Sequence, residues 1–441
     1  FYKGLVMILK LSDNYICDNS LECEKNCYFV LTKSNEKFLA DAKAKGAQII
    51  TPAKAYELAK IPKDLKIIGI TGTNGKTTTA TLISYILNRL NQKCLNLGTR
   101  GAFLSNKNNI EQLAPKGLTT NQFLATLSLL KTASQRGCEY CVMEVSSHAI
   151  AQKRIQSLPF ILKIFTNLSQ DHLDFHKTFD EYARTKSDFF ADDVMKLINA
   201  DDVNIKYFKA NSKLYSCQKE ADFFIINSDL SKGIKAKISA NNKIYHLSSQ
   251  LQGRFNLYNI LCAFGACVML GFDGEKIIKA IADFDGVAGR MQIISSKPLV
   301  IVDFAHTPDG ILKVLESLQG RNIIAVFGAG GDRDALKRPL MGEIAARYAK
   351  TLIITSDNPR SEEPNSIIAQ IRAGIDPNTK AQVFCEVDRK KAIKMALDFA
   401  KNDEIIVILG KGDEDYQEIN GIKYHFSDSE CVRELLAQMN A

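Results

Sequence analysis

The chain has 441 residues, of which 46% are hydrophobic and 24% charged, and its formal net charge is +8 at pH 7. This length predicts several domains with cores of their own, and the composition excludes a disordered or fibrous chain. No basic block is interleaved with aromatic residues, and no apolar run reaches the roughly 18–20 residues of a membrane span. We therefore expect a cytoplasmic protein that binds small anionic substrates, with no nucleic acid partner and no membrane span.

The first part of the chain, residues 7–65, has the pattern of a small α/β domain. Apolar and amphipathic runs predict a strand at Tyr28–Leu31, a helix at Glu36–Lys45 and a second strand at Gly46–Ile50. No signal-peptide pattern stands at the N-terminus, and we expect Met7 to be the true start.

Residues 66–291 are predicted to form the central domain. Strand-like runs at 67–70, 140–145 and 160–166 alternate with helical patterns, which is typical of a doubly wound, mostly parallel sheet. Residues 223–251 have the short alternating segments of a β-rich insertion.

Residues 292–441 are predicted to form a third, Rossmann-like α/β domain. Its strands are expected at 298–303, 322–327, 351–355, 382–384 and 405–409, with helices between them. The fold class is therefore α/β, in three domains.

The most informative motif is the run Thr71–Thr79, which lies between an apolar strand and an amphipathic helix. The glycines of such a loop allow backbone N–H groups to converge on phosphates, and the helix N-terminus adds its dipole. Lys76 would reach the terminal phosphates, and the Thr77 hydroxyl would hold Mg²⁺. Ile70 stands where the common phosphate-loop template has glycine, and the competing interpretation is a plain glycine turn. The motif predicts a nucleoside triphosphate site.

Polar residues follow two of the predicted central strands. Glu144–His148 follows one, and the second is followed by a run that contains Asp171, His172, Asp174 and His176. Such side chains suit Mg²⁺ or general-base chemistry, but they are also common caps of a following helix, and the spacing leaves both interpretations open. Further along, Lys186 lies in a helical pattern at 181–190, where a lysine is by default solvated.

Two loops of the third domain carry arginines. Arg333 follows a glycine-rich turn at 327–331, and Arg360 ends the run Asp-Asn-Pro-Arg at 357–360. A guanidinium binds a carboxylate through two parallel hydrogen bonds, so a substrate carboxylate is expected here. An ion pair between domains is the alternative.

The 11 cysteines are expected to be free, buried thiols. Cys138 and Cys141 form a Cys-x-x-Cys pair within a predicted buried strand, and Cys23 and Cys27 lie near the N-terminus. A zinc or disulfide framework would need a second pair at the appropriate spacing, which we do not find.

Together these motifs resemble the Mur ligases, the ATP-dependent amino-acid-adding enzymes of peptidoglycan synthesis. The resemblance covers nearly the whole chain through motifs at 72–78, 118–120, 144–148, 171–176, 253–259, 289–292, 303–309 and 330–334. The Asp-Asn-Pro-Arg run at 357–360 is similar to that of the members that add meso-2,6-diaminopimelate, and lysine-adding relatives usually lack this arginine.

The resemblance implies roles for individual residues. The residues implied to bind ATP are Gly72, Thr73, Asn74, Gly75, Lys76, Thr77, Thr78, Asn256, Asn259, Asp303 and His306. Those implied to bind the UDP-muramoyl-dipeptide are Ser20, Thr119, Thr120, Ser146, Gln152 and Arg154. Those implied to bind the amino acid are Arg333, Asp357, Asn358, Pro359, Arg360, Gly410 and Glu414.

The same resemblance implies a magnesium site and a modified lysine. Thr77, Glu144, His172 and Lys186 are implied as metal contacts, with Lys186 carried as N6-carboxylysine. Lys76, Lys186, His172 and Arg290 are the implied catalytic residues. The family commonly has histidine where this chain has Asp413, which changes the surroundings of the amino-acid site.

The implied reaction is ATP-dependent ligation of meso-2,6-diaminopimelate to the D-glutamate γ-carboxylate of UDP-N-acetylmuramoyl-L-alanyl-D-glutamate through an acyl phosphate. The protein would act as a monomer in cell-wall precursor synthesis, and hence in cell shape and division. Three alternatives stay open: the same reaction with L-lysine, a folylpolyglutamate-synthetase-like ligase, and a catalytically inactive nucleotide-binding relative.

Overall fold

The fold is taken from a computed structural model, which describes residues 8–107, 109–169, 173–208, 211–231, 233–401 and 403–439. The chain forms two compact units. The first contains the residues up to 249 together with 256–284, and the second contains 250–255 together with the residues from 285 onward. Among the helices that the structure describes, none has the length and apolar character of a membrane-spanning segment.

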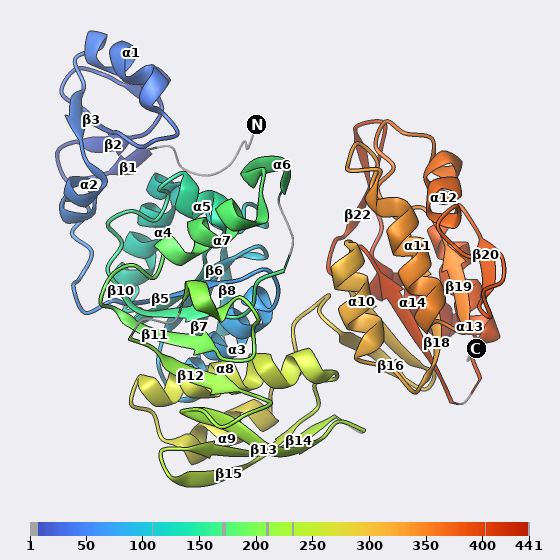
Figure 1. The fold of residues 1–441 in the computed structure, drawn as a ribbon. Coiled ribbons are helices and arrows are strands. Elements are labelled where there is room, and N and C mark those ends of the chain that lie inside the picture. Colours follow the sequence, from blue (N-terminus) through green and yellow to red (C-terminus); the bar gives the residue numbers. More distant parts are fainter. Residues whose placement is uncertain are drawn as a thin grey trace. The chain divides into compact units, whose positions relative to one another are not determined.

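The N-terminal part of the first unit is a small four-stranded sheet (Figure 1). Its strands are β1 (Ile8–Lys10), β2 (Tyr15–Cys17), β3 (Tyr28–Val30) and β4 (Gln48–Ile50), of which only the first pair is antiparallel. The helices are α1 (Leu39–Ala44) and α2 (Pro52–Leu58), with 3₁₀ turns η1 (Ser20–Glu22) and η2 (Glu36–Phe38). The helix expected at 36–45 is thus divided between η2 and α1.

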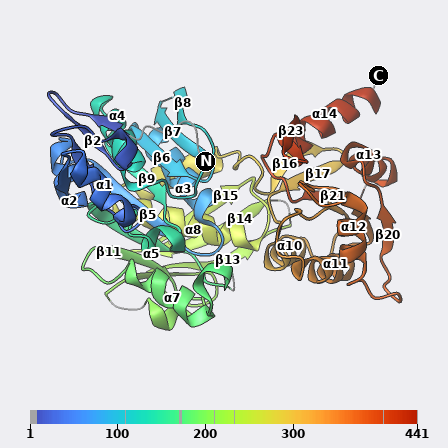
Figure 2. The ribbon, with the colours of Figure 1, turned by 90° about the horizontal axis from the view of Figure 1, so that it is seen from above.

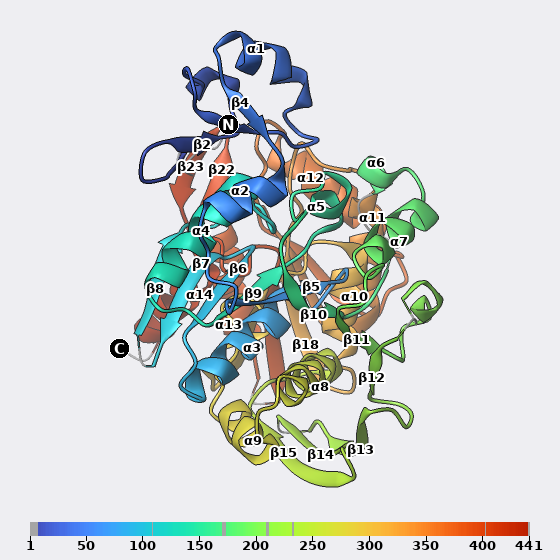
Figure 3. The same cartoon turned by 90° about the vertical axis from the view of Figure 1, so that its left-hand side faces the viewer.

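The remainder of the first unit is built on an 11-stranded sheet in the order β15-β14-β13-β12-β11-β10-β5-β9-β6-β7-β8 (Figure 3). The strands are β5 (Lys66–Thr71), β6 (Cys94–Gly98), β7 (Gly101–Asn106), β8 (Asn109–Ala114), β9 (Tyr140–Glu144), β10 (Phe160–Phe165), β11 (Met195–Asn199), β12 (Lys213–Ser216), β13 (Phe223–Asp229), β14 (Ile234–Ala240) and β15 (Lys243–Ser249). Neighbours from β6 to β13 in this order run parallel. The prediction of a mostly parallel α/β sheet is confirmed.

Helices connect these strands. They are α3 (Lys76–Arg89), α4 (Phe123–Gln135), α5 (Ser147–Ala151), α6 (Leu173–His176), α7 (Phe179–Asp188), α8 (Arg254–Met269) and α9 (Gly274–Ala282), with a 3₁₀ turn η3 (Ile205–Tyr207). Strand β5 is buried from Ile67 to Thr71, because both faces of a parallel sheet are covered by helices. The β-rich segment expected at 223–251 is present as β13–β15, and it extends the edge of the same sheet.

The second unit is a six-stranded sheet in the order β16-β17-β21-β18-β19-β20, parallel apart from β16. Its strands are β16 (Gln292–Ser296), β17 (Leu299–Asp303), β18 (Asn322–Phe327), β19 (Thr351–Ile354), β20 (Gln382–Cys385) and β21 (Glu404–Leu409), followed by the hairpin β22 (Tyr416–Ile419) and β23 (Ile422–His425). Helices α10 (Pro308–Glu316), α11 (Lys337–Tyr348) and α12 (Pro364–Arg372) pack on one face, and α13 (Arg389–Phe399) and α14 (Asp428–Met439) on the other (Figure 2). The Rossmann-like prediction is confirmed.

A buried ion pair joins α13 and α14 in this unit. The Arg389 guanidinium donates to both Asp428 oxygens at 2.7 and 2.8 Å, and both side chains are 0% exposed. Arg389 also donates to the Leu409 carbonyl at 2.9 Å, at the end of β21. The pair therefore fixes the start of two helices against the strand end that precedes Gly410.

The substitution Asp428→Asn is expected to reduce the free energy of unfolding of this unit by about 3–5 kcal/mol, since it leaves the Arg389 charge buried and uncompensated. Urea denaturation measures this change. The control is Glu434→Gln, which removes the partner of Lys390 in a pair between the same two helices that is 49% and 59% exposed. An exposed pair contributes about 0–1 kcal/mol, so equal losses in the two variants would contradict the role given to Asp428.

All 11 cysteines are free, and nine of them are buried. Cys138 is 7% exposed and Cys141 0%, so this pair belongs to the core around β9. The expectation of burial holds for nine of the 11 cysteines, whereas Cys385 is exposed and Cys217 is half-buried. The sequence did not indicate that Cys17 lies beside Cys23 and Cys27, and the structure brings these three together.

Candidate active site

The loop between β5 and α3 has the geometry of a phosphate cradle. Gly72 has φ +149° and Gly75 has φ +84°, conformations that side chains other than glycine rarely adopt. A Cβ at Gly72 would lie 1.9 Å from Thr166 Oγ1, and one at Gly75 would lie 2.5 Å from Asn259 Oδ1. Glycine is therefore required at both positions, because the backbone has a positive φ and because a side chain would clash with its neighbours. Helix α3 begins immediately afterwards at Lys76, so its N-terminus faces the loop.

The loop after β10 supports this cradle. Thr73 N donates to Asn167 O at 2.8 Å and Asn74 N to Asn167 Oδ1 at 3.0 Å. Thr166 Oγ1 in turn donates to Asn74 O at 2.6 Å. From the other side, Thr79 Oγ1 donates to Asn259 Oδ1 at 3.3 Å. The cradle is thus held by the loop that follows β10 and by Asn259 of α8.

Two side chains of the loop, those of Lys76 and Thr77, contact the loop backbone and the end of β9. The Lys76 amine donates to the carbonyls of Gly72 and Thr73, each at 2.8 Å, so it lies over the loop. The Thr77 hydroxyl donates to Glu144 Oε2 at 3.0 Å. Glu144 ends β9, is 2% exposed, and also accepts from Thr99 N at 3.1 Å. The structure thus joins the phosphate loop to the predicted metal carboxylate.

The default expectation for Lys186, a solvated side chain, is wrong. Lys186 is 2% exposed, and its amine donates to Gly72 O at 3.1 Å and Thr71 Oγ1 at 3.3 Å. Helix α7 turns this face inward because Tyr182, one turn earlier, is also buried and lies 3.0 Å from Thr73 Oγ1 through its hydroxyl. Lys186 therefore belongs to the wall of the cradle.

Part of the second polar run lies outside the described residues. Asp171 and His172 are among these, and the side chain of Asp174 is likewise not described. His176 is 0% exposed, and its ring centroid lies 5.2 Å from that of Tyr182. His176 therefore packs beneath α7 near Lys186, whereas the expectation for His172 stays untested.

The residues expected to bind the muramoyl peptide form one group beside Glu144, with Ser20 apart. Thr120 Oγ1 donates to Glu144 O at 2.9 Å and lies 3.3 Å from Ser146 Oγ. Arg154 donates to Thr120 O at 3.0 Å, and burial lowers its pKa. The two remaining members are Thr119, whose hydroxyl lies 3.1 Å from that of Thr99, and Gln152, which accepts from Arg154 Nε at 2.8 Å.

Ser20 belongs to the N-terminal sheet region, at the first position of η1. It is 3% exposed, and its carbonyl accepts from Lys45 Nζ at 2.8 Å. Ser20 is therefore enclosed in this turn, whereas its neighbour Leu21 is 78% exposed.

In the second unit, three loops at the sheet edge are joined through Asn358. Its Nδ2 donates to Glu414 Oε2 at 2.9 Å, and its carbonyl accepts from Gly331 N at 2.9 Å. At Gly410, φ is +112° and a Cβ would lie 2.5 Å from Asp357 Oδ2. The runs 328–333, 357–360 and 410–414 therefore form one continuous surface.

The two arginines differ in their surroundings. Arg360 has φ +52°, and its Nη1 donates to Gly331 O at 2.6 Å while Nε lies 3.5 Å from Glu418 Oε2. Arg333 is exposed, and its Cγ and Arg360 Nη1 would both lie within 4 Å of a Cβ placed on Gly330. Both side chains therefore border Gly330, and the Glu418 contact of Arg360 lies within its own unit.

Of the remaining nucleotide residues, Asn256 lies in α8 and accepts from Asn259 Nδ2 at 3.0 Å. The others are at the start of the second unit. The Arg290 guanidinium lies 4.4 Å from the centroid of the Phe304 ring, and His306 Nδ1 lies 2.8 Å from Phe304 O. Asp303 accepts from the N–H groups of Met291 and Ala305 at 2.7 and 2.8 Å. Burial raises the pKa of Asp303, against the opposing effect of the Arg290 charge.

Sequence reasoning missed several supporting residues. Lys411 is 0% exposed, and its amine lies 3.2 Å from Asn358 Oδ1 and 3.5 Å from Glu414 Oε2, so it neutralises and fixes the three-loop surface. The position of Lys411 between Gly410 and Glu414 was the only feature of the sequence that could have indicated this role. Arg338 donates to Glu362 and to Gly330 O, and its hydrogen bonds lower the pKa of Glu362 to about 2. No local pattern distinguishes Arg338 from a surface arginine.

The donors beside the cradle fit a magnesium ion. They are a hydroxyl, that of Thr77, and a buried carboxylate, that of Glu144, and hard oxygen ligands are those that Mg²⁺ prefers. A Cβ on Gly98 would lie 2.1 Å from Glu144 Oε1, so glycine is required there to admit this carboxylate.

The chain was compared with known protein families and curated proteins. The Mur ligase middle domain matches residues 70–267, and the Mur ligase, glutamate ligase domain matches residues 289–412. A UDP-N-acetylmuramoyl-L-alanyl-D-glutamate--2,6-diaminopimelate ligase of Helicobacter pylori (strain J99) is 45% identical over 435 residues, covering 96% of this chain and 95% of that protein. A protein of the same name from Wolinella succinogenes is 43% identical over 427 residues, covering 96% of both.

Solved structures give a similar result. A structure of a UDP-N-acetylmuramoyl-L-alanyl-D-glutamate--2,6-diaminopimelate ligase has a TM-score of 0.70 and 31% identity, and the match covers 97% of this chain and 95% of that one. The folylpolyglutamate synthase of Mycobacterium tuberculosis, complexed with ADP and AMPPCP, has a TM-score of 0.63 at 16% identity, with 81% and 91% covered. This second likeness shows a shared fold alone.

Proposed function

The chain belongs to the Mur ligase family, and we propose that it joins meso-2,6-diaminopimelate to the D-glutamate γ-carboxylate of UDP-N-acetylmuramoyl-L-alanyl-D-glutamate. ATP is converted to ADP and phosphate in this reaction. The product is a precursor of peptidoglycan, and we place the enzyme in the cytoplasm, where it acts as a monomer. The domain limits that we propose are 7–65 for the uridine nucleotide, 66–291 for ATP and 292–441 for the incoming amino acid.

The observation that carries the choice of amino acid is the three-loop surface of the second unit. It presents an anion, Glu414, and two cations, Arg333 and Arg360, around the backbone of Gly330 and Asn358. One end of diaminopimelate carries both an ammonium and a carboxylate. A carboxylate suits the fork of a guanidinium, and an ammonium suits Glu414. L-lysine lacks the second carboxylate and would offer the Arg360 guanidinium no substrate carboxylate to bind, which disfavours that alternative.

The first step that we propose is activation of the γ-carboxylate. A carboxylate oxygen attacks the γ-phosphorus of ATP, a new O–P bond forms, and the bond to ADP breaks. Lys76 and the N–H groups of the cradle stabilise the charge on the phosphates. Thr77, Glu144, His172 and Lys186 would hold Mg²⁺, which would supply further neutralisation of that charge. The product is an acyl phosphate.

The second step is amide formation. The neutral amine of diaminopimelate attacks the acyl carbon, a C–N bond forms, and the C–O bond to phosphate breaks, with one amine proton released. Gly410 and Glu414 are proposed to hold the amino acid, together with Asp357–Arg360. Thr119, Thr120, Ser146, Gln152 and Arg154 are proposed to hold the muramoyl peptide.

Further contacts are proposed from the family pattern. Ser20 is proposed for the uridine nucleotide, and Asn256, Asn259, Arg290, Asp303 and His306 are proposed for ATP. Lys186 is proposed to carry a carbamate, an anion formed from its neutral amine and CO₂ with release of one proton. Its burial beside Gly72 and Thr71 supports a role at the phosphate end of the site.

An amino-acid panel tests this function. With ATP, Mg²⁺ and the UDP-muramoyl-dipeptide, phosphate release is expected with meso-diaminopimelate, and at least about 100-fold less with L-lysine, since a site built for a polar group rejects analogues that lack it. Omission of the dipeptide or of Mg²⁺ should remove the signal. Equal release with L-lysine would exclude the proposed substrate, and release with folate in place of the dipeptide would indicate a folylpolyglutamate synthetase.

A further inference from the structure

Three cysteines of the N-terminal sheet region converge on one point, in the segment that also carries Ser20. Cys17 ends β2, Cys23 follows η1, and Cys27 precedes β3. Cys17 Sγ lies 3.5 Å from Cys23 Sγ and 3.9 Å from Cys27 Sγ, and all three sulfurs lie within 4.8 Å of one another. The three side chains are 0%, 6% and 1% exposed.

These separations match those of a metal–thiolate site. With Zn–S bonds of about 2.3 Å and tetrahedral angles, neighbouring sulfurs lie about 3.8 Å apart. The two measured separations, 3.5 and 3.9 Å, lie on either side of that value. A disulfide would instead require one pair to approach to about 2.05 Å.

A purely apolar role explains the burial of these thiols but not their surroundings. The fully buried part of the local core consists of the three cysteines with Phe29 and Ala42, and the partly buried residues Ile8, Tyr15, Leu31, Ala47 and Ile49 pack against it. Glu24 N donates to Cys27 Sγ at 3.4 Å, so this sulfur accepts a backbone hydrogen bond.

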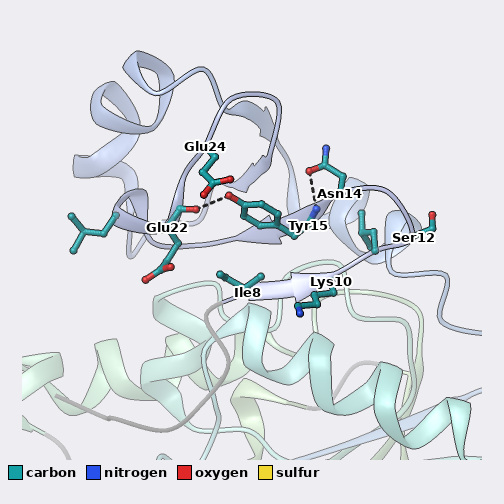
Figure 4. Close-up of a pocket in the computed structure, with 9 residues that line it drawn as sticks. Ile8, Lys10, Ser12, Asn14, Tyr15, Glu22 and Glu24 are labelled. Atoms are coloured by element: carbon teal, nitrogen blue, oxygen red, sulfur yellow. Dashed lines mark hydrogen bonds between the residues drawn. The ribbon is translucent and has the colours of Figure 1, made fainter.

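The chain segment between the cysteines is held from both sides. On one side Lys45 Nζ donates to Ser20 O at 2.8 Å, which brings a positive charge to the same turn. On the other side the Tyr15 hydroxyl donates to Glu22 O at 2.9 Å, in the pocket lined by Asn14 and Glu24 (Figure 4). The segment 17–27, in which the three cysteines lie, is therefore held in place by hydrogen bonds from Lys45 and Tyr15.

We propose that Cys17, Cys23 and Cys27 bind one Zn²⁺ ion as thiolates. Binding forms three Zn–S bonds and releases three protons to solvent, and it leaves a site of net charge −1 beside Lys45. Within the described part of the chain, no fourth His, Cys, Asp or Glu joins this group, so the fourth position is filled by water or another small ligand. Because the cysteines lie at the two ends and in the middle of 17–27, the ion fixes the turn that carries Ser20.

The test uses the full-length protein, purified under reducing conditions and freed of metal with a chelator. Titration with Zn²⁺ against a chromophoric competitor is expected to give one tightly bound ion per chain. Substitution to serine of any of the three cysteines should weaken binding by at least about 100-fold, since loss even of an outer-shell partner of a metal costs 10- to 100-fold. The control Cys385→Ser removes an exposed thiol and should change nothing.

A second measurement covers variants that fail to fold. In the unchanged protein, Zn²⁺ should protect Cys17, Cys23 and Cys27 from alkylation, as mapped by peptide mass, while Cys385 stays reactive. Cobalt(II) in place of zinc should show the charge-transfer absorption of three thiolates. Absence of a stoichiometric ion, equal affinity in Cys17→Ser, binding of Cu(I) only, or a Cys17–Cys23 disulfide that persists in reductant would each overturn the proposal.

Discussion

The substitution Lys186→Ala is expected to reduce kcat by about 100- to 1000-fold, the loss typical of removing a group that stabilises charge at a reaction centre. The amine of Lys186 is buried and bonded to Gly72 O and Thr71 Oγ1, so its removal acts directly on the phosphate loop. If Lys186 carries a carbamate, the lost group is an anion. The KM for diaminopimelate should change little, because that amino acid is assigned to the second unit.

The carbamate itself is tested by rescue. A short carboxylic acid, such as acetate or formate, should restore part of the activity of Lys186→Ala in a concentration-dependent way, whereas the matching amine should not. The control is Lys206→Ala, which removes an exposed lysine of the same unit and should retain full activity. Rescue by the amine alone would assign Lys186 a cationic role, and full activity of Lys186→Ala would remove it from the mechanism.

The substitution Arg360→Ala is expected to raise the KM for meso-diaminopimelate by about 10- to 150-fold, corresponding to the roughly 1.5–3 kcal/mol of a hydrogen bond to a charged group. The KM for ATP should stay within about twofold of its original value, because the nucleotide residues of the phosphate loop are untouched. Steady-state kinetics with each substrate varied in turn measure both quantities. The Arg360→Lys variant should recover only part of the loss, since an ammonium lacks the planar fork.

The same variant discriminates between amino acids. L-Lysine has no second carboxylate, so its KM should be nearly equal in the original protein and in Arg360→Ala. The control Arg372→Ala removes an exposed arginine at the end of α12 and should leave both amino acids unaffected. If Arg360→Ala raised the KM for L-lysine as much as that for diaminopimelate, Arg360 would only support the loop, through Gly331 and Glu418.

Local features could be predicted because the physical signal lies in adjacent residues. The cradle at 71–79 depends on two glycines with unusual φ, a strand before them and a helix after them, and all of this is visible in a short stretch. Strands β9, β10, β18 and β21 were placed by their apolar runs, because strands of parallel sheets are buried on both faces. The family resemblance, in turn, rests on such stretches recurring in order.

Features that depend on long-range packing could not be predicted in this way. Lys186 appeared as a solvated lysine, since its burial depends on Gly72, which is 114 residues distant in the sequence. The role of Asn358 as a link between Gly331 and Glu414 likewise required three separate loops to meet. The residues next to a side chain in the sequence do not indicate which distant residues will pack against it.

The amino-acid sequence by itself determined that this protein has a phosphate loop, α/β domains and a pair of arginines after strand ends, because dihedral preferences and apolar periodicity act between neighbours along the chain. Tertiary structure alone decided that Lys186 is enclosed beside Gly72 and that the thiols of Cys17, Cys23 and Cys27 meet. These contacts join groups that come together only once the sheets have formed. No short segment of the sequence therefore predicts them.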